Sequence, residues 1–129
     1  SLLDGAQELL PMASIYHLGF VRNEETLEAS CYLNKLPSQL HPQTRVLIPE
    51  PMLATGGTIT AVMAELTNRG VDPAMVRIIS VVTSPVALKK LSATYPSLNI
   101  YTAAIDEHVN EKGFIVPGLG DAGDRTFGT

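Results

Sequence analysis

The sequence contains few of the residues that mark several classes of protein. A single cysteine, Cys31, excludes a disulfide framework within the chain and fits a reducing compartment. There are 9 Lys and Arg residues against 13 Asp and Glu, without any basic block, which disfavours binding to the phosphate backbone of nucleic acid. No apolar run approaches the ~20 residues of a membrane span, and the start shows no signal-peptide pattern. We therefore expect a cytoplasmic protein with no nucleic-acid partner and no membrane partner.

The residues that are present are sufficient for a packed core. The chain has 129 residues, of which 45% are hydrophobic and 17% charged, a balance that predicts one folded domain over residues 1–129 rather than disorder. Leucines at helical spacing predict a helix over Leu2–Leu10. Because the sequence starts inside this helix without a visible cap, we expect it to be the N-terminally truncated part of a longer protein.

The next part of the sequence predicts a pair of strands. Ser14–Arg22 and Ala29–Leu33 are both strand-like, and the polar stretch Asn23–Glu28 separates them. This pattern is typical of a hairpin or of a mobile arm. The proline-containing segment Asn34–Thr44 then predicts a loop.

The middle of the chain alternates between apolar strands and amphipathic helices. The expected elements are a strand at Arg45–Glu50, a turn at Pro51–Thr58, a helix from Ile59 that stops at Gly70, a strand at Val76–Thr83, a helix capped by Ser84 that ends before Pro96, and a strand at Leu98–Ala104. This order predicts right-handed crossovers and a parallel sheet. The continuous apolar character of Val76–Thr83 further predicts that both faces of the sheet are covered.

The turn Pro51–Thr58, with the sequence PMLATGGT, is a candidate phosphate site. A turn that leaves a parallel strand and enters a helix exposes unpaired N–H groups at the positive end of the helix dipole. Gly56 and Gly57 allow the backbone to close around an anion, and Thr55 and Thr58 add hydroxyls. The turn is not a P-loop, because no Lys follows the glycines. The alternative is a tight turn without a ligand.

A carboxylate next to this turn indicates which phosphate compound would bind. Glu50 would repel a phosphate, so we expect it to accept hydrogen bonds from vicinal ribose hydroxyls instead, and a sugar phosphate satisfies both features. The alternative is a solvated glutamate at a strand end. Arg22, at the end of a strand, could clamp a diphosphate or could pair with a surface glutamate.

The C-terminal segment is rich in glycine, proline and aspartate. Phe114–Asp124 predicts a fixed irregular loop or a floppy tail, whose exposed backbone groups could read the edge of a planar base. Asp121 and Asp124 could hold a hydrated Mg²⁺ that neutralises a pyrophosphate. The alternative is an acidic surface turn.

Three motifs together resemble one family. PMLATGGT after a strand, RNEETLE upstream and the terminal GFIVPGLGDAGDRTFGT are similar to uracil phosphoribosyltransferases over nearly the whole chain. The resemblance implies an α/β fold in which helices flank a phosphoribosyltransferase-like parallel sheet, with a β-hairpin arm and an irregular C-terminal base-binding loop. It implies a pyrimidine-salvage reaction of uracil with 5-phosphoribosyl 1-diphosphate, with Mg²⁺ as cofactor, that gives UMP and pyrophosphate.

The resemblance also implies a role for individual residues. Glu50 and Asp121 would be catalytic, Asp121 would hold the metal through water, and the Arg22–Leu33 arm would be a lid. The donor site would comprise Arg22, Glu50, Pro51, Met52, Leu53, Ala54, Thr55, Gly56, Gly57, Thr58 and Asp121. The uracil site would comprise Ile115, Gly120, Asp121 and Ala122.

Two departures from the family pattern keep other interpretations open. Glu50 stands where the family usually has Asp, and family members are longer at the N-terminus, with another strand of the sheet. The alternative is a non-catalytic nucleotide-binding regulator of the same fold, and a third reading is an interaction domain without a ligand. The resemblance further implies GTP binding and a homodimer or larger homo-oligomer, and the apolar sheet edge also favours self-association.

Overall fold

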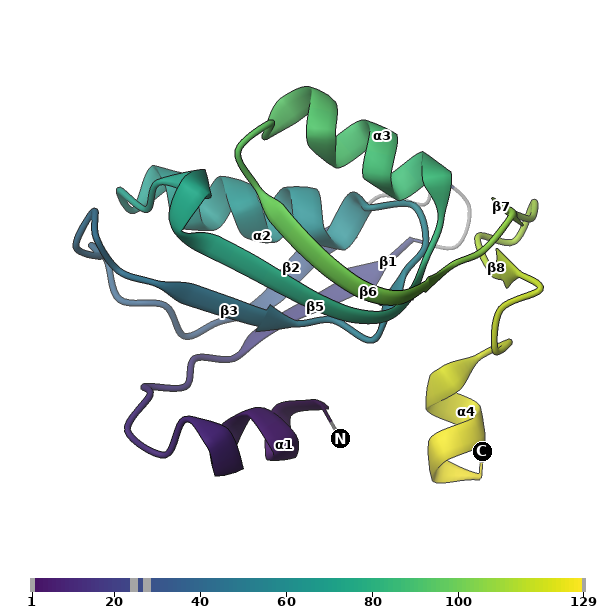
Figure 1. Ribbon diagram of the computed structural model, residues 1–129, viewed down its shortest axis with the longest axis horizontal. Helices are drawn as coiled ribbons and strands as arrows, with labels where there is room; N and C mark the ends of the chain where they lie inside the picture. The colour runs from purple at the N-terminus through teal and green to yellow at the C-terminus, as the bar shows by residue number, and fades with distance from the viewer. Residues whose placement is uncertain (1, 24–25, 27–28, 129) are drawn as a thin grey trace.

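The computed structural model describes residues 2–23, 26 and 29–128, and the side chain of Arg22 lies outside the described part. Its elements are α1 Leu2–Leu9, β1 Leu18–Arg22, β2 Ala29–Asn34, β3 Val46–Pro49, β4 Met52–Leu53, α2 Gly57–Asn68, a 3-10 turn Pro73–Met75, β5 Val76–Thr83, α3 Pro85–Thr94, β6 Asn99–Ile105, β7 His108–Val109, β8 Ile115–Val116 and α4 Ala122–Phe127 (Figure 1). No helix among these residues is long and apolar enough to cross a membrane.

A parallel sheet forms the centre of the molecule, as predicted. β5 pairs with β6 on one side and with β3 and β4 on the other, always in parallel. Val46 lies opposite Val76 and Met52 opposite Val82, so β3 and β4 follow β5 in one continuous register. The prediction of a turn from Pro51 was wrong at its start, because pairing with β5 keeps the chain extended as far as Leu53.

The hydrophobic core lies between the sheet and two helices. In Figure 1, α2 and α3 lie on the same face of the sheet. The side chains that meet there are fully or almost fully buried, and they come from α2, β5 and α3: Ile59, Met63, Leu66, Val76, Ile78, Ala87 and Leu91. Burying each large aliphatic side chain contributes about 1.5–3 kcal/mol, so this interface holds α2 and α3 firmly against the sheet. The helix predicted from Ile59 is confirmed, and it begins two residues earlier, at Gly57.

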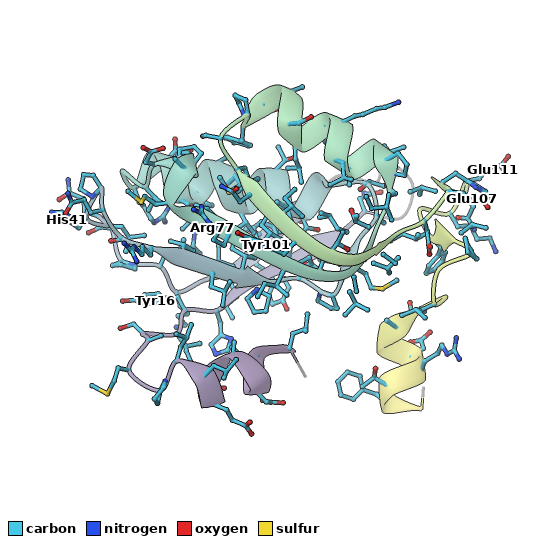
Figure 2. All side chains as sticks on the ribbon, in the orientation of Figure 1. Tyr16, His41, Arg77, Tyr101, Glu107 and Glu111 are labelled. Atoms are coloured by element: carbon cyan, nitrogen blue, oxygen red, sulfur yellow. The ribbon has the colours of Figure 1, made fainter. Side chains whose placement is uncertain are left out.

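On the other face of the sheet, α1 lies near β3, whereas β5 and β6 are open in the described part of the chain. Ile79 and Val81 of β5 are 37% and 39% exposed, and Tyr101 and Ile105 of β6 are 58% and 60% exposed. Ile79 pairs with Tyr101, so these side chains form one apolar surface, on which Figure 2 labels Tyr101. The prediction that both faces are covered was wrong for this chain, because α2 and α3 both pack on the opposite face.

The predicted N-terminal helix and hairpin are confirmed, with α1 and β1 shorter than predicted and β2 one residue longer, to Asn34. α1 ends at Leu9, and β1 pairs with β2 in antiparallel register, with Arg22 opposite Ala29. Residues 14–17 are not part of the strand. Most of the connection between the two strands lies outside the described residues.

The C-terminal segment is more regular than predicted. β7 and β8 form an antiparallel pair, in which His108 lies opposite Val116. The side chain of Asp121 accepts a hydrogen bond of 2.9 Å from the N–H of Asp124 and caps the short helix α4. The prediction of an irregular loop or tail was wrong for this helix, because the aspartate acts as an N-cap residue.

Candidate functional site

The sequence motif PMLATGGT forms a tight connection between β4 and α2. Its residues Ala54–Thr58, here called the phosphate loop, follow the carboxyl end of β4 and include the first residues of α2. Together with Glu50, Met52, Leu53 and Ile59, the loop lines a small pocket of about 70 Å³. The sheet therefore presents a concave site where parallel strands end and a helix begins, the position at which open α/β sheets bind ligands.

The backbone N–H groups of the phosphate loop are available to a ligand. Within the described residues, the N–H groups of Ala54, Thr55, Gly56 and Thr58 donate to no acceptor. The N–H of Gly57 makes a long contact of 3.4 Å with Thr55 Oγ1. The first N–H of α2 bonded inside the helix is that of Thr60, which donates to the Gly56 carbonyl. Unpaired donors at the positive end of a helix dipole favour the binding of an anion.

Gly56 gives the phosphate loop its tight turn. Its φ is +73°, in the left-handed region, and a Cβ there would lie 3.4 Å from the Cα of Ala87 in α3. A Cβ on Gly57 would meet Thr55 Oγ1 at 3.5 Å, an ordinary contact. The conformational need for glycine thus falls on Gly56, whereas the sequence had indicated both positions.

Glu50 places a carboxylate in the same pocket. It lies between β3 and β4, where the N–H of Met52 donates to its Oε1 at 3.5 Å. Burial raises the pKa of Glu50 above its ordinary value of 4.5, and the hydrogen bond from Met52 lowers it by less. A half-buried carboxylate oxygen accepts hydrogen bonds, so a neutral hydroxyl donor would suit it, as expected for a contact to ribose.

The C-terminal segment is fixed at the carboxyl end of the sheet. The N–H of Asp106 donates to the carbonyl of Thr83 at 2.9 Å, and Asp106 Oδ2 accepts from the N–H of Gly118 at 2.8 Å. The sequence interpretation missed Asp106, although an acidic residue directly after a strand is a usable signal. In Figure 1, β7, β8 and α4 lie at the end of the sheet where β5 and β6 finish.

The predicted uracil residues occupy this segment but do not line the 70 Å³ pocket. Ile115 is 3% exposed, whereas Gly120 and Asp121 are exposed and Ala122 is half-buried. Pro51, which was predicted in the donor site, is also absent from the pocket lining, and its carbonyl accepts hydrogen bonds from β5. Arg22 is in β1, and its side chain is outside the described part.

Asp121 offers limited support for a metal. Among the described residues, no group of three or more His, Cys, Asp or Glu side chains could hold an ion. One oxygen of Asp121 caps α4, and the exposed carboxylate still has acceptor capacity on its other oxygen. Mg²⁺ keeps several waters and binds through one or two carboxylates and substrate phosphates, so Asp121 fits a water-mediated contact.

Comparison with known proteins agrees with the resemblance of the motifs. The family model "Uracil phosphoribosyltransferase" matches residues 1–129. The uracil phosphoribosyltransferase of Nostoc sp. is 73% identical over 128 residues, which cover 99% of this chain and 59% of the relative. The chloroplastic uracil phosphoribosyltransferase of Arabidopsis thaliana is 50% identical over 129 residues, which cover 100% of this chain and 44% of the relative.

A solved structure, that of the AQ2163 protein from Aquifex aeolicus, has the same fold. It superposes with a TM-score of 0.86 at 36% identity, over 97% of this chain and 58% of that one. The chain spans about three fifths of the length of the relatives from Nostoc sp. and Synechocystis sp.. Since the family model matches all 129 residues, this chain belongs to the uracil phosphoribosyltransferase family.

Proposed function

We propose that the protein containing this chain transfers a phosphoribosyl group from 5-phosphoribosyl 1-diphosphate to N1 of uracil, giving UMP and pyrophosphate. The observation that carries the proposal is the phosphate loop, whose free N–H groups lie beside the carboxylate of Glu50 in one pocket. Membership of the family supports the choice of substrates. No observation favours the alternative of a non-catalytic regulator.

The donor would bind through the two ends of its ribose. The N–H groups of the phosphate loop and the hydroxyls of Thr55 and Thr58 would hold the 5-phosphate at the start of α2. Glu50 would accept hydrogen bonds from the vicinal hydroxyls, which would fix the orientation of the sugar ring. Holding both reactants in a reactive geometry removes much of the entropic barrier of a two-substrate reaction.

The chemistry would be a substitution at the anomeric carbon. The bond from C1 to the diphosphate oxygen would break ahead of the attack by N1 of uracil, so that positive charge develops on the ribose, as it does in glycoside hydrolysis. N1 would lose its proton to solvent or to the departing pyrophosphate as the new bond to C1 forms. Arg22 would stabilise the leaving diphosphate. When bound, Mg²⁺ supplies further neutralisation of the negative charge on the diphosphate, and Asp121 is the residue that would hold the ion through water.

Selection of uracil would rest on backbone groups of the C-terminal segment. The groups of Ile115 and Ala122 would match O4 and N3–H of uracil. Cytosine would place an amine against a buried donor, and this mismatch would cost binding. The hairpin β1–β2 would act as a lid that excludes water, because the donor can hydrolyse.

The direct test is to incubate the protein with uracil, the donor and Mg²⁺ and to measure UMP by chromatography, with cytosine as the control base. UMP from uracil and none of the corresponding product from cytosine would support the proposal. Conversion of another base without conversion of uracil would show that the substrate is wrong. Binding of the donor or of UMP without turnover would favour the regulator.

A further inference from the structure

Buried hydroxyls lie directly beneath the phosphate loop. The side chains of Ser80, Thr83 and Ser84, at the end of β5 and the start of α3, are 4%, 0% and 0% exposed. Their hydroxyls donate in turn to the carbonyls of Pro51, Leu53 and Ala54. Because a buried polar group is costly unless it is hydrogen-bonded, these contacts fix the backbone that enters the loop.

The carbonyls of Leu53 and Ala54 differ in how many donors they have. The Leu53 carbonyl accepts from the Thr83 hydroxyl at 3.0 Å and also from the N–H of Ser84 at 3.1 Å. For the Ala54 carbonyl, the hydroxyl of Ser84 is the one donor found among the described residues. The direction of the Ala54 carbonyl therefore depends on a single side chain.

The direction of this carbonyl determines that of the next N–H. In a planar trans peptide, the C=O of one residue and the N–H of the next point in opposite directions. The Ala54–Thr55 bond is trans, since the one cis bond in the described chain is Val116–Pro117. With the Ala54 carbonyl drawn inward to Ser84, the N–H of Thr55 is directed outward, toward the pocket that Thr55 lines.

Ser84 is itself held in place by α3. Its Oγ accepts a hydrogen bond of 3.2 Å from the N–H of Ala87 and caps the helix, so one hydroxyl accepts from α3 and donates to the loop. Ala87 also packs against Gly56 of the loop. The first turn of α3 thus forms a rigid support for the phosphate loop.

We propose that Ser84 is a positioning residue for the 5-phosphate of the donor, and that its hydroxyl acts by directing the N–H of Thr55 at the phosphate. This proposal rests on the proposed function. It assigns to Ser84 a second role beyond the N-cap that the sequence predicts.

The test compares three variants by the KM for the donor and by calorimetric binding of ribose 5-phosphate. For Ser84→Ala we expect the donor and ribose 5-phosphate to bind about five- to tenfold more weakly, because one hydrogen bond to the phosphate is misdirected. The kcat and the KM for uracil should not change. Thr83→Val should change binding less than about twofold, because the Leu53 carbonyl keeps a second donor. Ser92→Ala is the matched control, since its exposed hydroxyl donates to the Lys89 carbonyl within α3.

Further measurements separate positioning from stability. A purely structural role would lower the melting temperature of Ser84→Ala and leave affinity for ribose 5-phosphate unchanged, and that result would overturn the proposal. Ser84→Thr keeps both the cap and the hydroxyl and should restore affinity. If Ser84→Ala does not fold, the affinity of Ser84→Gly for ribose 5-phosphate is measured instead. Glycine also lacks the hydroxyl but is tolerated at N-caps. Failure of the unmodified protein to bind ribose 5-phosphate would instead contradict the proposed function.

Discussion

Glu50 illustrates how a buried carboxyl group makes the stability of a fold depend on pH. Burial raises its pKa in the folded state above the ordinary value of 4.5, and the hydrogen bond from Met52 offsets only part of this. The folded state therefore binds the proton more tightly than the unfolded state. The favourable contribution is complete below the ordinary pKa and is lost as the pH rises through the raised pKa. Ionisation of Glu50 as the pH rises through the raised pKa therefore lowers the stability of the fold.

We therefore predict that Glu50→Gln raises the melting temperature at about pH 7.5 and that the gain disappears below about pH 4.5. The same change should weaken donor binding about tenfold or more, because a charged acceptor for the ribose hydroxyls is lost. Thermal unfolding at both pH values and donor titration measure the two effects. Glu111→Gln, at the exposed hairpin turn labelled in Figure 2, is the matched control. A variant less stable than the unmodified chain at neutral pH would contradict this account.

The two glycines of the phosphate loop should respond differently to substitution. Gly56→Ala places a Cβ at a φ of +73° and 3.4 Å from Ala87, so we predict a loss of stability. The left-handed conformation alone accounts for about 1–2 kcal/mol of that loss. Gly57→Ala meets only an ordinary contact and should cost much less. Urea unfolding of both variants measures the difference, and equal losses would show that Gly56 is not the strained position.

The sequence predicts which residues form the phosphate loop, but it does not predict how they are arranged in space. The motif predicted correctly that Glu50 and the residues Met52–Thr58 lie together, because they are adjacent along the chain and the strand–helix order fixes their place. It could not tell Gly56 from Gly57, because φ depends on the packing of α3 against the loop. Nor could it show that Ser84 donates to Ala54, a contact between residues 30 positions apart.

Among the elements, the hairpin and α2 are joined by a small polar cluster. Arg69, at the end of α2, pairs with the carboxylate of Glu65 and donates to the Pro37 carbonyl at 3.0 Å. The side-chain amide of Asn34, the last residue of β2, donates to the same carboxylate at 2.7 Å. The base of the hairpin is thereby tied to the helix whose other end carries the phosphate loop.

We predict that Arg69→Ala loosens this connection. The loss of its hydrogen bonds and of a partly exposed ion pair should reduce the free energy of unfolding by about 1–2 kcal/mol. Amide hydrogen exchange should become faster in Ala29–Asn34 and remain unchanged in β5. Lys90→Ala, an exposed cation of α3, serves as the control. Unchanged exchange in β2 would mean that the strand is held by other contacts.

The elements themselves were predicted to different degrees. β5, α3 and β6 appear nearly where their apolar patterns place them, because strong periodicity and a Ser-Pro cap define their limits. The short strands β4, β7 and β8 were missed. Two-residue strands carry no periodicity, and they form only because a partner strand lies beside them.

For the molecule as a whole, the notable surface is the open apolar one formed by Ile79, Val81, Tyr101 and Ile105. Exposed patches of this kind mark interaction sites or aggregation-prone surfaces. We predict that this chain self-associates at micromolar concentration and that Tyr101→Glu reduces the association. Light scattering after size-exclusion chromatography measures the mass. Val86→Glu, which adds a charge at an exposed position of α3, is the control. An equal effect of both variants on the measured mass would show that the chain does not associate through this surface.

The interruption between β3 and β4 has a consequence for how copies of the chain can meet. The N–H of Glu50 donates to Ile79 of β5, so the nitrogen of its neighbour Pro49 is directed at the outer edge, where a proline has nothing to donate. Pro51 likewise lacks an N–H. A strand from another molecule that paired with this edge would lack hydrogen-bond donors at both prolines. Natural sheets place proline on edge strands in this way, which hinders edge-to-edge aggregation. At the edge formed by β3 and β4, a second chain therefore cannot extend the sheet by an unbroken ladder of hydrogen bonds.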